Sequence, residues 1–406
     1  MPMTTAHPFA VRATTLLAEL EGKGELKHLQ VIDGPMDASV RLQQPDGSFK
    51  EALCFCSNNY LGLANHPEVV EAGIRGLREF GAGTASVRFI CGTFTPHLEL
   101  EQRIADFLGV ESAYTFVSCW NANEALFPTL AEPGDAIVSD ALNHACIIDS
   151  IRLAGVINKG VNKFIYVNND MADFEAKLVA ARAKTDDDNV IWVITDGVFS
   201  MEGSVADLPT MRRLCDAHNA VLCVDDSHGT GVLGQTGRGT HEHLGMSGDA
   251  IDIFGSTLGK ALGGGAGGFL AGTRAMTELI VQRARPTLFS NALPVTVACS
   301  ASKAIEVLQR EPERVQTLRD NVAYARQKIT AAGFDVIDSP TAICPVIVGE
   351  TAKAIEMSHR LLELGVYVIG FGYPVVPEGE ARLRCQISAA HTIEHIDTLV
   401  DALKKL

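Results

Sequence analysis

The sequence lacks an apolar run of the roughly 18 residues that a membrane-spanning helix needs. It also lacks a Cys-x-x-Cys pair, so its ten scattered cysteines predict reduced thiols of a cytoplasmic protein rather than a disulfide framework or a zinc site. The first twenty residues have no basic segment before an apolar core, so we expect no secretory signal, and Arg12 gives only a weak likeness to an organelle-targeting segment. Positive charge is scarce, and the net charge of -15 argues against nucleic acid or an anionic membrane as the main partner.

What the sequence does contain is enough apolar residue, 47% of 406, to bury a large core. Its 37 glycines against 16 prolines indicate many tight turns of an α/β protein rather than disorder. We expect an N-terminal arm over residues 1–62, a large domain over 63–295 and a smaller α+β domain over 296–406.

Apolar strand-like runs alternate with helical stretches through the large domain, which predicts a mainly parallel sheet covered by helices on both faces. In such sheets the ligand lies beyond the carboxyl ends of the strands. Polar residues follow the expected strands at those ends, namely Asn143, His144, Ser200, Asp225, His228, Thr257 and Lys260. One such residue would be read as a turn or a helix cap, but this many together predict a functional site.

The C-terminal third contains two long helical stretches and a few short strands. Arg382 and Arg384 lie in one of these strands, and we expect them on opposite faces, one toward a cleft and one toward solvent.

The stretch 251–270, IDIFGSTLGKALGGGAGGFL, places a single lysine, Lys260, among small residues. Such a lysine can form a Schiff base, because burial lowers its pKa, or it can bind a phosphate as in a P-loop. The P-loop spacing is one residue short here, and Ala261 stands where that motif has a hydroxyl. The G-x-G-x-x-G pattern that begins at Gly263 lies too deep in the chain for the first turn of a dinucleotide-binding unit. A surface lysine beside a flexible loop would be the simplest alternative.

The residues around Lys260 favour pyridoxal 5'-phosphate (PLP) as the partner of the lysine. A carboxylate beside the pyridine nitrogen keeps that nitrogen protonated, which suits Asp225. A flat ring such as His144 can stack on the cofactor, and His228 can donate to its phenolic oxygen. The phosphate needs amides at a helix N-terminus, available after Ser118, and a hydroxyl such as that of Thr257.

Six segments, in this order along the chain, resemble the α-oxoamine synthases: SNNYLGL, SDALNHACIID, TDGVFSMEG, VDDSHGTG, STLGKALGGGAGG and RLRCQISAAHT. These are fold-type I PLP enzymes that condense an amino acid with an acyl-CoA. The likeness is greatest to the branch that acetylates glycine, because of NNYLGLANHPE, ASVRFICGT and FGYPVVPEGEARLR. Two features depart from that branch: Trp120-Asn121 stands where it has Phe-Asp, and VDDSHGTG is more like the 8-amino-7-oxononanoate synthases.

The resemblance implies a role for each matching residue. Lys260 resembles the lysine that binds PLP covalently, Asp225 the partner of the ring nitrogen and His144 the stacking histidine. The remaining implied positions are Ser200 and His228 beside the phenolic oxygen, Cys119, Trp120 and Thr257 at the phosphate, Asn58 and Arg384 at the substrate carboxylate, and Ser290 and Asn291 reaching the cofactor of a partner subunit.

The resemblance therefore implies a homodimeric enzyme that joins glycine to acetyl-CoA and gives 2-amino-3-oxobutyrate and CoA. A different acyl-CoA or amino acid, as in 8-amino-7-oxononanoate synthase, is the first alternative. A scaffold subunit without activity is the second, and the presence of Lys260, Asp225 and His228 together argues against it.

Overall fold

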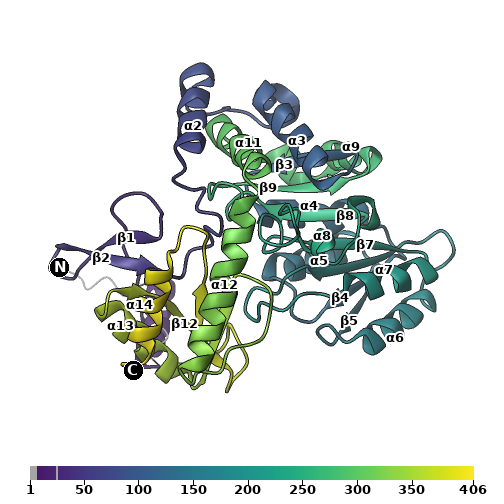
Figure 1. Ribbon diagram of the computed structural model, residues 1–406. Coiled ribbons are helices and arrows are strands. Elements are labelled where there is room, and N and C mark those ends of the chain that lie inside the picture. The colour runs from purple at the N-terminus through teal and green to yellow at the C-terminus, as the bar shows by residue number, and fades with distance from the viewer. Residues whose placement is uncertain (1–6, 24–25) are drawn as a thin grey trace, which may run out of the picture.

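Seven strands form the central sheet of the computed structural model, which describes residues 7–23 and 26–406 (Figure 1). Their spatial order is β3-β9-β8-β7-β6-β4-β5, with bounds β3 (Ser112–Phe116), β4 (Ala136–Asp140), β5 (Asn162–Tyr166), β6 (Ile191–Asp196), β7 (Ala220–Asp225), β8 (Ile253–Thr257) and β9 (Gly268–Gly272). Strand β9 is antiparallel to both of its neighbours, whereas β8, β7, β6, β4 and β5 pair in parallel. The mainly parallel sheet predicted from the sequence is confirmed.

Alternate residues of the inner parallel strands β4, β6, β7 and β8 belong to two hydrophobic cores, one on each face of the sheet. In β6, Ile191 and Val193 lie in the first core, and Trp192 and Ile194 lie in the second. Successive side chains of a strand point to opposite faces, so a strand covered on both sides reads as a continuous apolar run. The first face is covered by α3 (Thr95–Leu108), α6 (Met171–Arg182) and α7 (Leu208–Ala217), and the second by α4 (Cys119–Leu130), α5 (Ala145–Ile157) and α9 (Arg274–Arg283).

A pair of packed helices and several short helical elements complete the large unit. Helices α2 (Pro67–Phe80) and α11 (Val295–Arg310) pack side by side at the end of the sheet that carries β3 (Figure 1). The short elements are a π-helix (Arg88–Gly92), α8 (Thr240–His243), a 3-10 turn (Gly248–Ala250) and α10 (Arg285–Phe289).

Strand β9 is absent from the sequence prediction, which placed only a glycine-rich loop in this region. Its first residue, Gly268, lies so close to the start of α4 that an added Cβ would meet the Cys119 nitrogen at 2.5 Å and its Cα at 2.4 Å. The glycine is therefore needed to bring the Lys260 loop against the N-terminus of α4. Strand propensity could not indicate β9, because glycine is depleted in ordinary strands.

A smaller α+β unit contains two three-stranded sheets. One pairs β10 (Ile343–Gly349), β13 (Ala381–Gln386) and β12 (Ile369–Phe371), and the other pairs β1 (Ser39–Gln43), β2 (Phe49–Cys54) and β11 (Val366–Tyr367). Helices α12 (Glu313–Ala331), α13 (Thr351–Glu363) and α14 (Ile393–Leu403) belong to this unit. Because β2 pairs in parallel with β11, residues 39–54 of the N-terminal arm are part of the C-terminal unit. The division at residues 62 and 295 stays a prediction.

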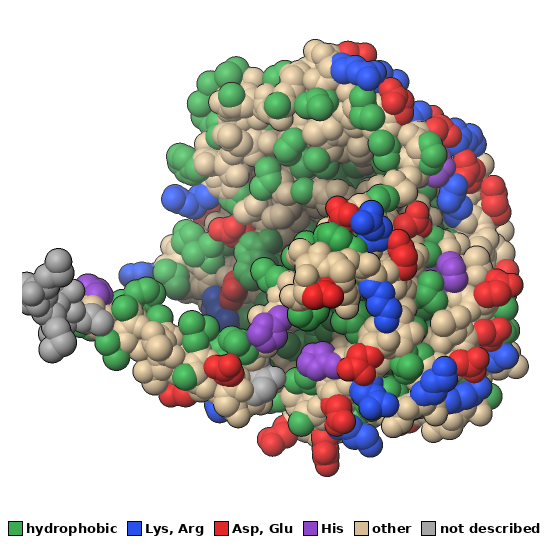
Figure 2. All heavy atoms as spheres, turned by 90° about the vertical axis from the view of Figure 1, so that its left-hand side faces the viewer, with side chains coloured by type: hydrophobic (Ala, Val, Ile, Leu, Met, Phe, Trp, Pro, Cys, Tyr) green, Lys and Arg blue, Asp and Glu red, His purple; other side chains and the backbone are tan. Residues whose placement is uncertain are grey.

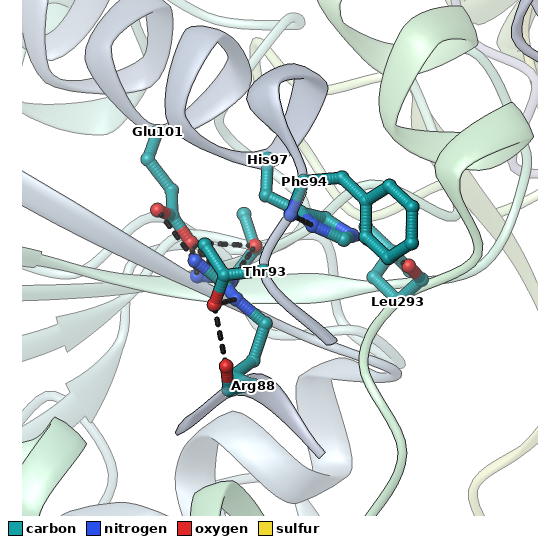
Figure 3. A network of polar contacts seen from close by, with 7 residues as sticks. Arg88, Thr93, Phe94, His97, Glu101 and Leu293 are labelled. Carbon is teal, nitrogen blue, oxygen red and sulfur yellow. Dashed lines mark hydrogen bonds and ion pairs between the residues drawn. The ribbon is translucent and has the colours of Figure 1, made fainter. Parts of the chain in front are cut away.

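Arg88 is buried, as its apolar and small neighbours in the sequence suggest, and it joins three elements (Figure 3). Its guanidinium donates from Nη1 and Nη2 to the Glu101 carboxylate of α3, at 2.7 and 3.0 Å. The same carboxylate accepts the amide of Thr115 in β3 at 2.9 Å, and the guanidinium lies 4.7 Å from the Tyr114 ring centroid. This network fixes β3, the strand that leads into the start of α4.

Helix α1 (Pro8–Gly22) has no buried residue in the structure. Figure 2 shows this end of the chain projecting from the body of the molecule, with hydrophobic side chains on its surface. Among residues 7–23 and 26–406, no helix is both long and apolar enough to cross a membrane.

Candidate active site

One cavity of about 160 Å³ lies at the carboxyl ends of β4, β6, β7 and β8, where the sequence predicted a ligand site. Eight of the predicted site residues line it: Cys119, Trp120, His144, Ser200, Asp225, His228, Thr257 and Lys260. Each is the last residue of a strand or lies within a few residues after one, so the order of the sheet brings them to one edge.

Lys260 lies three residues after the end of β8, and its side chain reaches back into the cavity. Its Nζ is 2.9 Å from Nε2 of His228. Burial lowers the pKa of Lys260, while the nearby charge of Asp225 opposes the shift. A lowered pKa increases the fraction of neutral amine, which is the form that reacts with a carbonyl carbon.

Asp225 ends β7 and is only 4% exposed. Its Oδ2 accepts a hydrogen bond from Asn123 Nδ2 at 2.6 Å, and its Oδ1 accepts from the Ser227 amide at 3.0 Å. Within the described parts of the chain no arginine or lysine forms an ion pair with it. A buried carboxylate without a cation is costly, so this one fits a ligand that brings a positive charge, as a protonated pyridine nitrogen does.

The N-terminus of α4 forms another wall of the cavity. Ser118 caps the helix by accepting the amide of Asn121 at 3.1 Å, so the amides of Cys119 and Trp120 lie ahead of the first intrahelical bond. Thr257 holds its hydroxyl beside them and accepts the Gly259 amide at 3.0 Å. Helix N-termini bind anions, so this end fits a phosphate group.

His144 caps α5, and its Nδ1 accepts the amide of Cys146 at 3.2 Å. Burial lowers the pKa of His144, which favours the neutral ring. The indole of Trp120 meets this ring edge to face, with centroids 6.3 Å apart. The imidazole is thus a fixed flat surface in the cavity, as a stacking partner of an aromatic ring requires.

A chain of hydrogen bonds leads from the cavity toward the small unit. His228 Nδ1 lies 2.8 Å from Oη of Tyr60, and that hydroxyl is also 3.2 Å from Oδ1 of Asn58. Gln386, with its carboxamide oriented to satisfy both neighbours, accepts from Arg384 at 2.7 Å and donates to Tyr60 at 3.3 Å. Asn58 and Arg384 are therefore brought near His228, although they do not line the cavity around Lys260 itself.

The expectation that one of Arg382 and Arg384 faces solvent is wrong. Residues two apart in a strand share a face, and these two are 1% and 8% exposed. Arg382 forms ion pairs with Glu202 at 3.2 Å and Glu380 at 3.1 Å. No carboxylate pairs with Arg384 anywhere in the described residues, so its guanidinium remains available for a ligand.

Three other predicted residues lie outside this cavity. Asn143 accepts the Asp196 amide at 2.7 Å and donates to the Ile194 carbonyl at 2.9 Å, so it fixes the end of β6. Ser290 and Asn291 follow α10 and line a separate hollow beside Tyr114. Their predicted contact with the cofactor of a partner subunit stays a prediction.

The sequence analysis missed several residues of the site, namely Tyr60, Asn123, Cys146, Asp196 and Ser227. Asn123 could have been found, because it lies four residues after Cys119 and so shares a helix face with it. Asp196 ends β6 beside Asp225, and burial together with that charge raises its pKa well above the ordinary value. Tyr60 lies in the segment SNNYLGL, but no local pattern indicates its partner, because His228 is 168 residues away.

Comparison with known proteins agrees with this geometry. Residues 50–403 match the family model described as aminotransferase class I and II. The chain is 46% identical over 386 residues to the mitochondrial 2-amino-3-ketobutyrate coenzyme A ligase of Bos taurus, covering 95% of this chain and 89% of that one. It is 40% identical to the 8-amino-7-oxononanoate synthase of Alkaliphilus oremlandii, covering 96% and 95% of the two chains.

The fold has a solved counterpart in a serine palmitoyltransferase from S. paucimobilis with bound PLP and myriocin. The two chains superpose with a TM-score of 0.88 at 28% identity, covering 97% of this chain and 96% of the other. The resemblance predicted from the six sequence segments is confirmed, and with it the fold of the PLP transferases. The chain belongs to the aminotransferase class I and II family, in the group that includes the 2-amino-3-ketobutyrate coenzyme A ligases.

Proposed function

We propose that this protein is a PLP-dependent enzyme that condenses glycine with acetyl-CoA to 2-amino-3-oxobutyrate and CoA. The observation that supports it most is the cavity itself, in which Lys260, Asp225, His144 and the start of α4 surround one space. The identity of 46% to a 2-amino-3-ketobutyrate coenzyme A ligase supports glycine and acetyl-CoA as substrates. Operating in reverse, the same reaction would suit threonine catabolism.

The residues of the cavity fit PLP at each of its functional groups. Lys260 would bind the carbonyl carbon, and Asp225 would lie beside the ring nitrogen. His144 would cover one face of the ring, and His228 with Ser200 would face the phenolic oxygen. The amides of Cys119 and Trp120 with the Thr257 hydroxyl would hold the phosphate.

Bound PLP supplies an electron-withdrawing ring that stabilises negative charge at the α-carbon of glycine. Lys260 then acts as the base for the α-proton, because burial favours its neutral amine and its Nζ stays beside His228. The carboxylate of Asp225 would stabilise the protonated, positively charged nitrogen of the PLP ring. It is free to do so because it has no other cation partner in the described chain. Lys260 would therefore transfer the proton, and Asp225 would stabilise the charge.

Arg384 and Asn58 would bind the glycine carboxylate. Arg384 is nearly buried and lacks an acidic partner among the described residues, whereas Arg382 in the same strand has two. A guanidinium binds a carboxylate through two parallel hydrogen bonds, which suits this position.

A homodimer is part of the proposal. Helix α1 carries five exposed apolar side chains, and three more cluster around the π-helix and α10; they are Phe9, Val11, Leu16, Leu17 and Leu20, and Phe89, Ile90 and Phe289. Apolar surface of this kind is typical of contacts between subunits. Ser290 directly follows Phe289, which supports its predicted approach to a partner's cofactor. A cytoplasmic location is also proposed, and the ten free cysteines suit a reducing compartment.

Substrate identity is tested by thiol release from a panel of acyl-CoAs, from acetyl to palmitoyl and including pimeloyl, each with glycine, alanine and serine. We expect the highest kcat/KM for acetyl-CoA with glycine, and weaker activity with propionyl-CoA, because one methylene discriminates by only about 1–3 kcal/mol. The 40% identity to an 8-amino-7-oxononanoate synthase makes pimeloyl-CoA with alanine the second candidate pair, and a preference for it would reject the first.

Enzyme and scaffold are distinguished in the same assay. Lys260→Ala should abolish thiol release and the visible absorption of bound PLP, whereas Lys159→Ala, at an exposed position, should change neither. Turnover within about tenfold of the parent, or about 1.4 kcal/mol of barrier, would remove Lys260 from the chemistry. A parent protein with neither PLP absorption nor thiol release would be a scaffold.

A further inference from the structure

We propose that Tyr60 is a positioning residue that keeps the proton of the His228 ring on Nε2, so that His228 donates a hydrogen bond into the cavity. Tyr60 is the residue that connects His228 to Gln386 of the small unit. The inference rests on the proposed function, because it assigns His228 to the phenolic oxygen of PLP.

The Tyr60 side chain is buried, and its hydroxyl is held in place by a close contact with the His228 ring. The residue is 1% exposed, and its Oη lies 2.8 Å from His228 Nδ1. The two rings meet edge to face, with centroids 6.1 Å apart and planes at 68°. Burial raises the pKa of Tyr60 to about 12, so the hydroxyl keeps its proton at every pH at which the protein is used.

His228 is a neutral imidazole in this environment. It is 8% exposed, and burial together with the charge of Lys260 moves its pKa well below the ordinary value. The positive charge of Arg384 and the His144 ring act in the same direction. Tyr60 also faces His228, and Asp225 lines the same cavity. A neutral imidazole carries one proton, so either Nδ1 or Nε2 is a donor and the other is an acceptor.

The contacts of Tyr60 select between these two tautomers. A phenol has one proton to donate, and its two possible acceptors are His228 Nδ1 at 2.8 Å and Asn58 Oδ1 at 3.2 Å. In the orientation of Gln386 that satisfies Arg384, its nitrogen donates to the Tyr60 oxygen at 3.3 Å and its oxygen lies 3.1 Å from the Asn58 atom assigned as Oδ1. That Asn58 atom must then be the amide nitrogen, which donates to Tyr60 instead of accepting from it, so the accepting side of the hydroxyl is filled. The phenol proton therefore points to Nδ1, and the ring proton must lie on Nε2.

This tautomer matters because Nε2 is the nitrogen that faces the cavity, 2.9 Å from Lys260 Nζ. An Nε2–H can donate to a phenolate oxygen. The other tautomer would place a lone pair against that oxygen, and two acceptors would repel each other. Tyr60 thus acts on the cofactor through His228, without touching it.

The test uses Tyr60→Phe, which removes one oxygen and keeps the buried ring. Tyr166→Phe is the matched control, since Tyr166 is also 1% exposed and its hydroxyl has no hydrogen-bond partner among the described residues. We expect Tyr60→Phe to lower kcat by about ten- to a hundredfold, as loss of a buried hydrogen bond does, and to change the glycine KM by less than about threefold. Tyr166→Phe should leave both values unchanged.

Two readouts do not depend on turnover. In the holoenzyme labelled with ¹⁵N-histidine, the His228 signals should show a protonated Nε2, and Tyr60→Phe should shift them toward a mixture of tautomers. The pH at which the visible absorption of bound PLP changes should rise in Tyr60→Phe, because a lost donor leaves the phenolic oxygen more basic. His228→Gln assigns the signals.

The outcomes separate this inference from the proposed function. A parent His228 with its proton on Nδ1 overturns the role of Tyr60, whatever the variant does. The role of Tyr60 is also overturned if Tyr60→Phe binds PLP and shows the same kcat, the same His228 tautomer and the same pH dependence of PLP absorption as Tyr166→Phe. A parent protein that shows the Nε2 proton but releases no thiol from any acyl-CoA would reject the proposed function instead.

Discussion

Replacing Arg88 by methionine should destabilise the fold strongly, because it leaves the Glu101 carboxylate buried without a cation. Four donors now reach that carboxylate. Two are guanidinium nitrogens of Arg88 (Figure 3), and the other two are the amide and hydroxyl of Thr115 at 2.9 and 2.8 Å. The variant keeps only the two from Thr115. Breaking a buried ion pair from one side costs about 3–5 kcal/mol. We expect Tm of the apoprotein to fall by about 5–10 °C, measured by circular dichroism.

A double-mutant cycle separates the ion pair from simple loss of packing. Arg88→Met with Glu101→Leu removes both charges, and we expect it to recover most of the loss, since a buried pair replaced by apolar residues is often neutral. The control is Arg283→Met, which breaks an ion pair of similar length, 3.0 Å, between side chains that are 52% and 55% exposed. Exposed pairs contribute about 0–1 kcal/mol, so this variant should keep its Tm.

The consequence for function follows from the position of β3. Arg88 and Glu101 hold Thr115, and β3 leads within two residues to Ser118 and the start of α4. Arg88→Met should therefore also release PLP more readily than Arg283→Met does. If Arg88→Met lost no more stability than Arg283→Met, or if the double variant were as unstable as the sum of the single ones, the reasoning from burial would be refuted.

Two further predictions concern the proposed chemistry. Asp225→Asn should still bind PLP, but it should slow the exchange of the glycine α-hydrogen in deuterated water by at least about a hundredfold, followed by NMR; an unchanged rate would show that the ring nitrogen does not depend on Asp225. Arg384→Ala should raise the glycine KM by about tenfold or more and the acetyl-CoA KM by less than about twofold, because the lost hydrogen bonds are to the amino-acid carboxylate. If the acetyl-CoA KM rose instead, Arg384 would belong to the CoA path.

The parts of the site that could be predicted from the sequence are those fixed by the sheet. Asp225, His228 and Lys260 follow apolar runs, and parallel strands bring such residues to one edge whatever the details of packing. Strand β9 could not be predicted, because Gly268 has no strand propensity and is required only by the close approach of Cys119. The pairing of β2 with β11 joins residues more than 300 positions apart, and no local pattern encodes it.

The misplacement of Arg382 came from a different cause, a wrong use of strand periodicity. Side chains alternate with a period of two, so Arg382 and Arg384 had to share a face, and the sequence alone was sufficient to predict this. What the sequence could not supply was their different surroundings. Glu202 approaches Arg382 from a loop some 180 residues earlier, whereas Gln386 and Tyr60, both uncharged, surround Arg384.

That difference in surroundings separates buried charges that serve the fold from those that serve the site. Arg88 and Arg382 are as deeply buried as Arg384, yet each contacts a carboxylate within the chain. Asp225 and Arg384 are buried and, within the described residues, form no ion pair at all. A buried charge without an ion partner lowers stability unless hydrogen bonds or a bound molecule compensate it, and the hydroxyls of Thr230 and Thr240 do so for the buried Asp226. We propose that a pyridinium nitrogen supplies the cation that Asp225 lacks and that an amino-acid carboxylate supplies the anion that Arg384 lacks. The cofactor would then lie at one end of the Tyr60–His228 connection and the substrate carboxylate at the other.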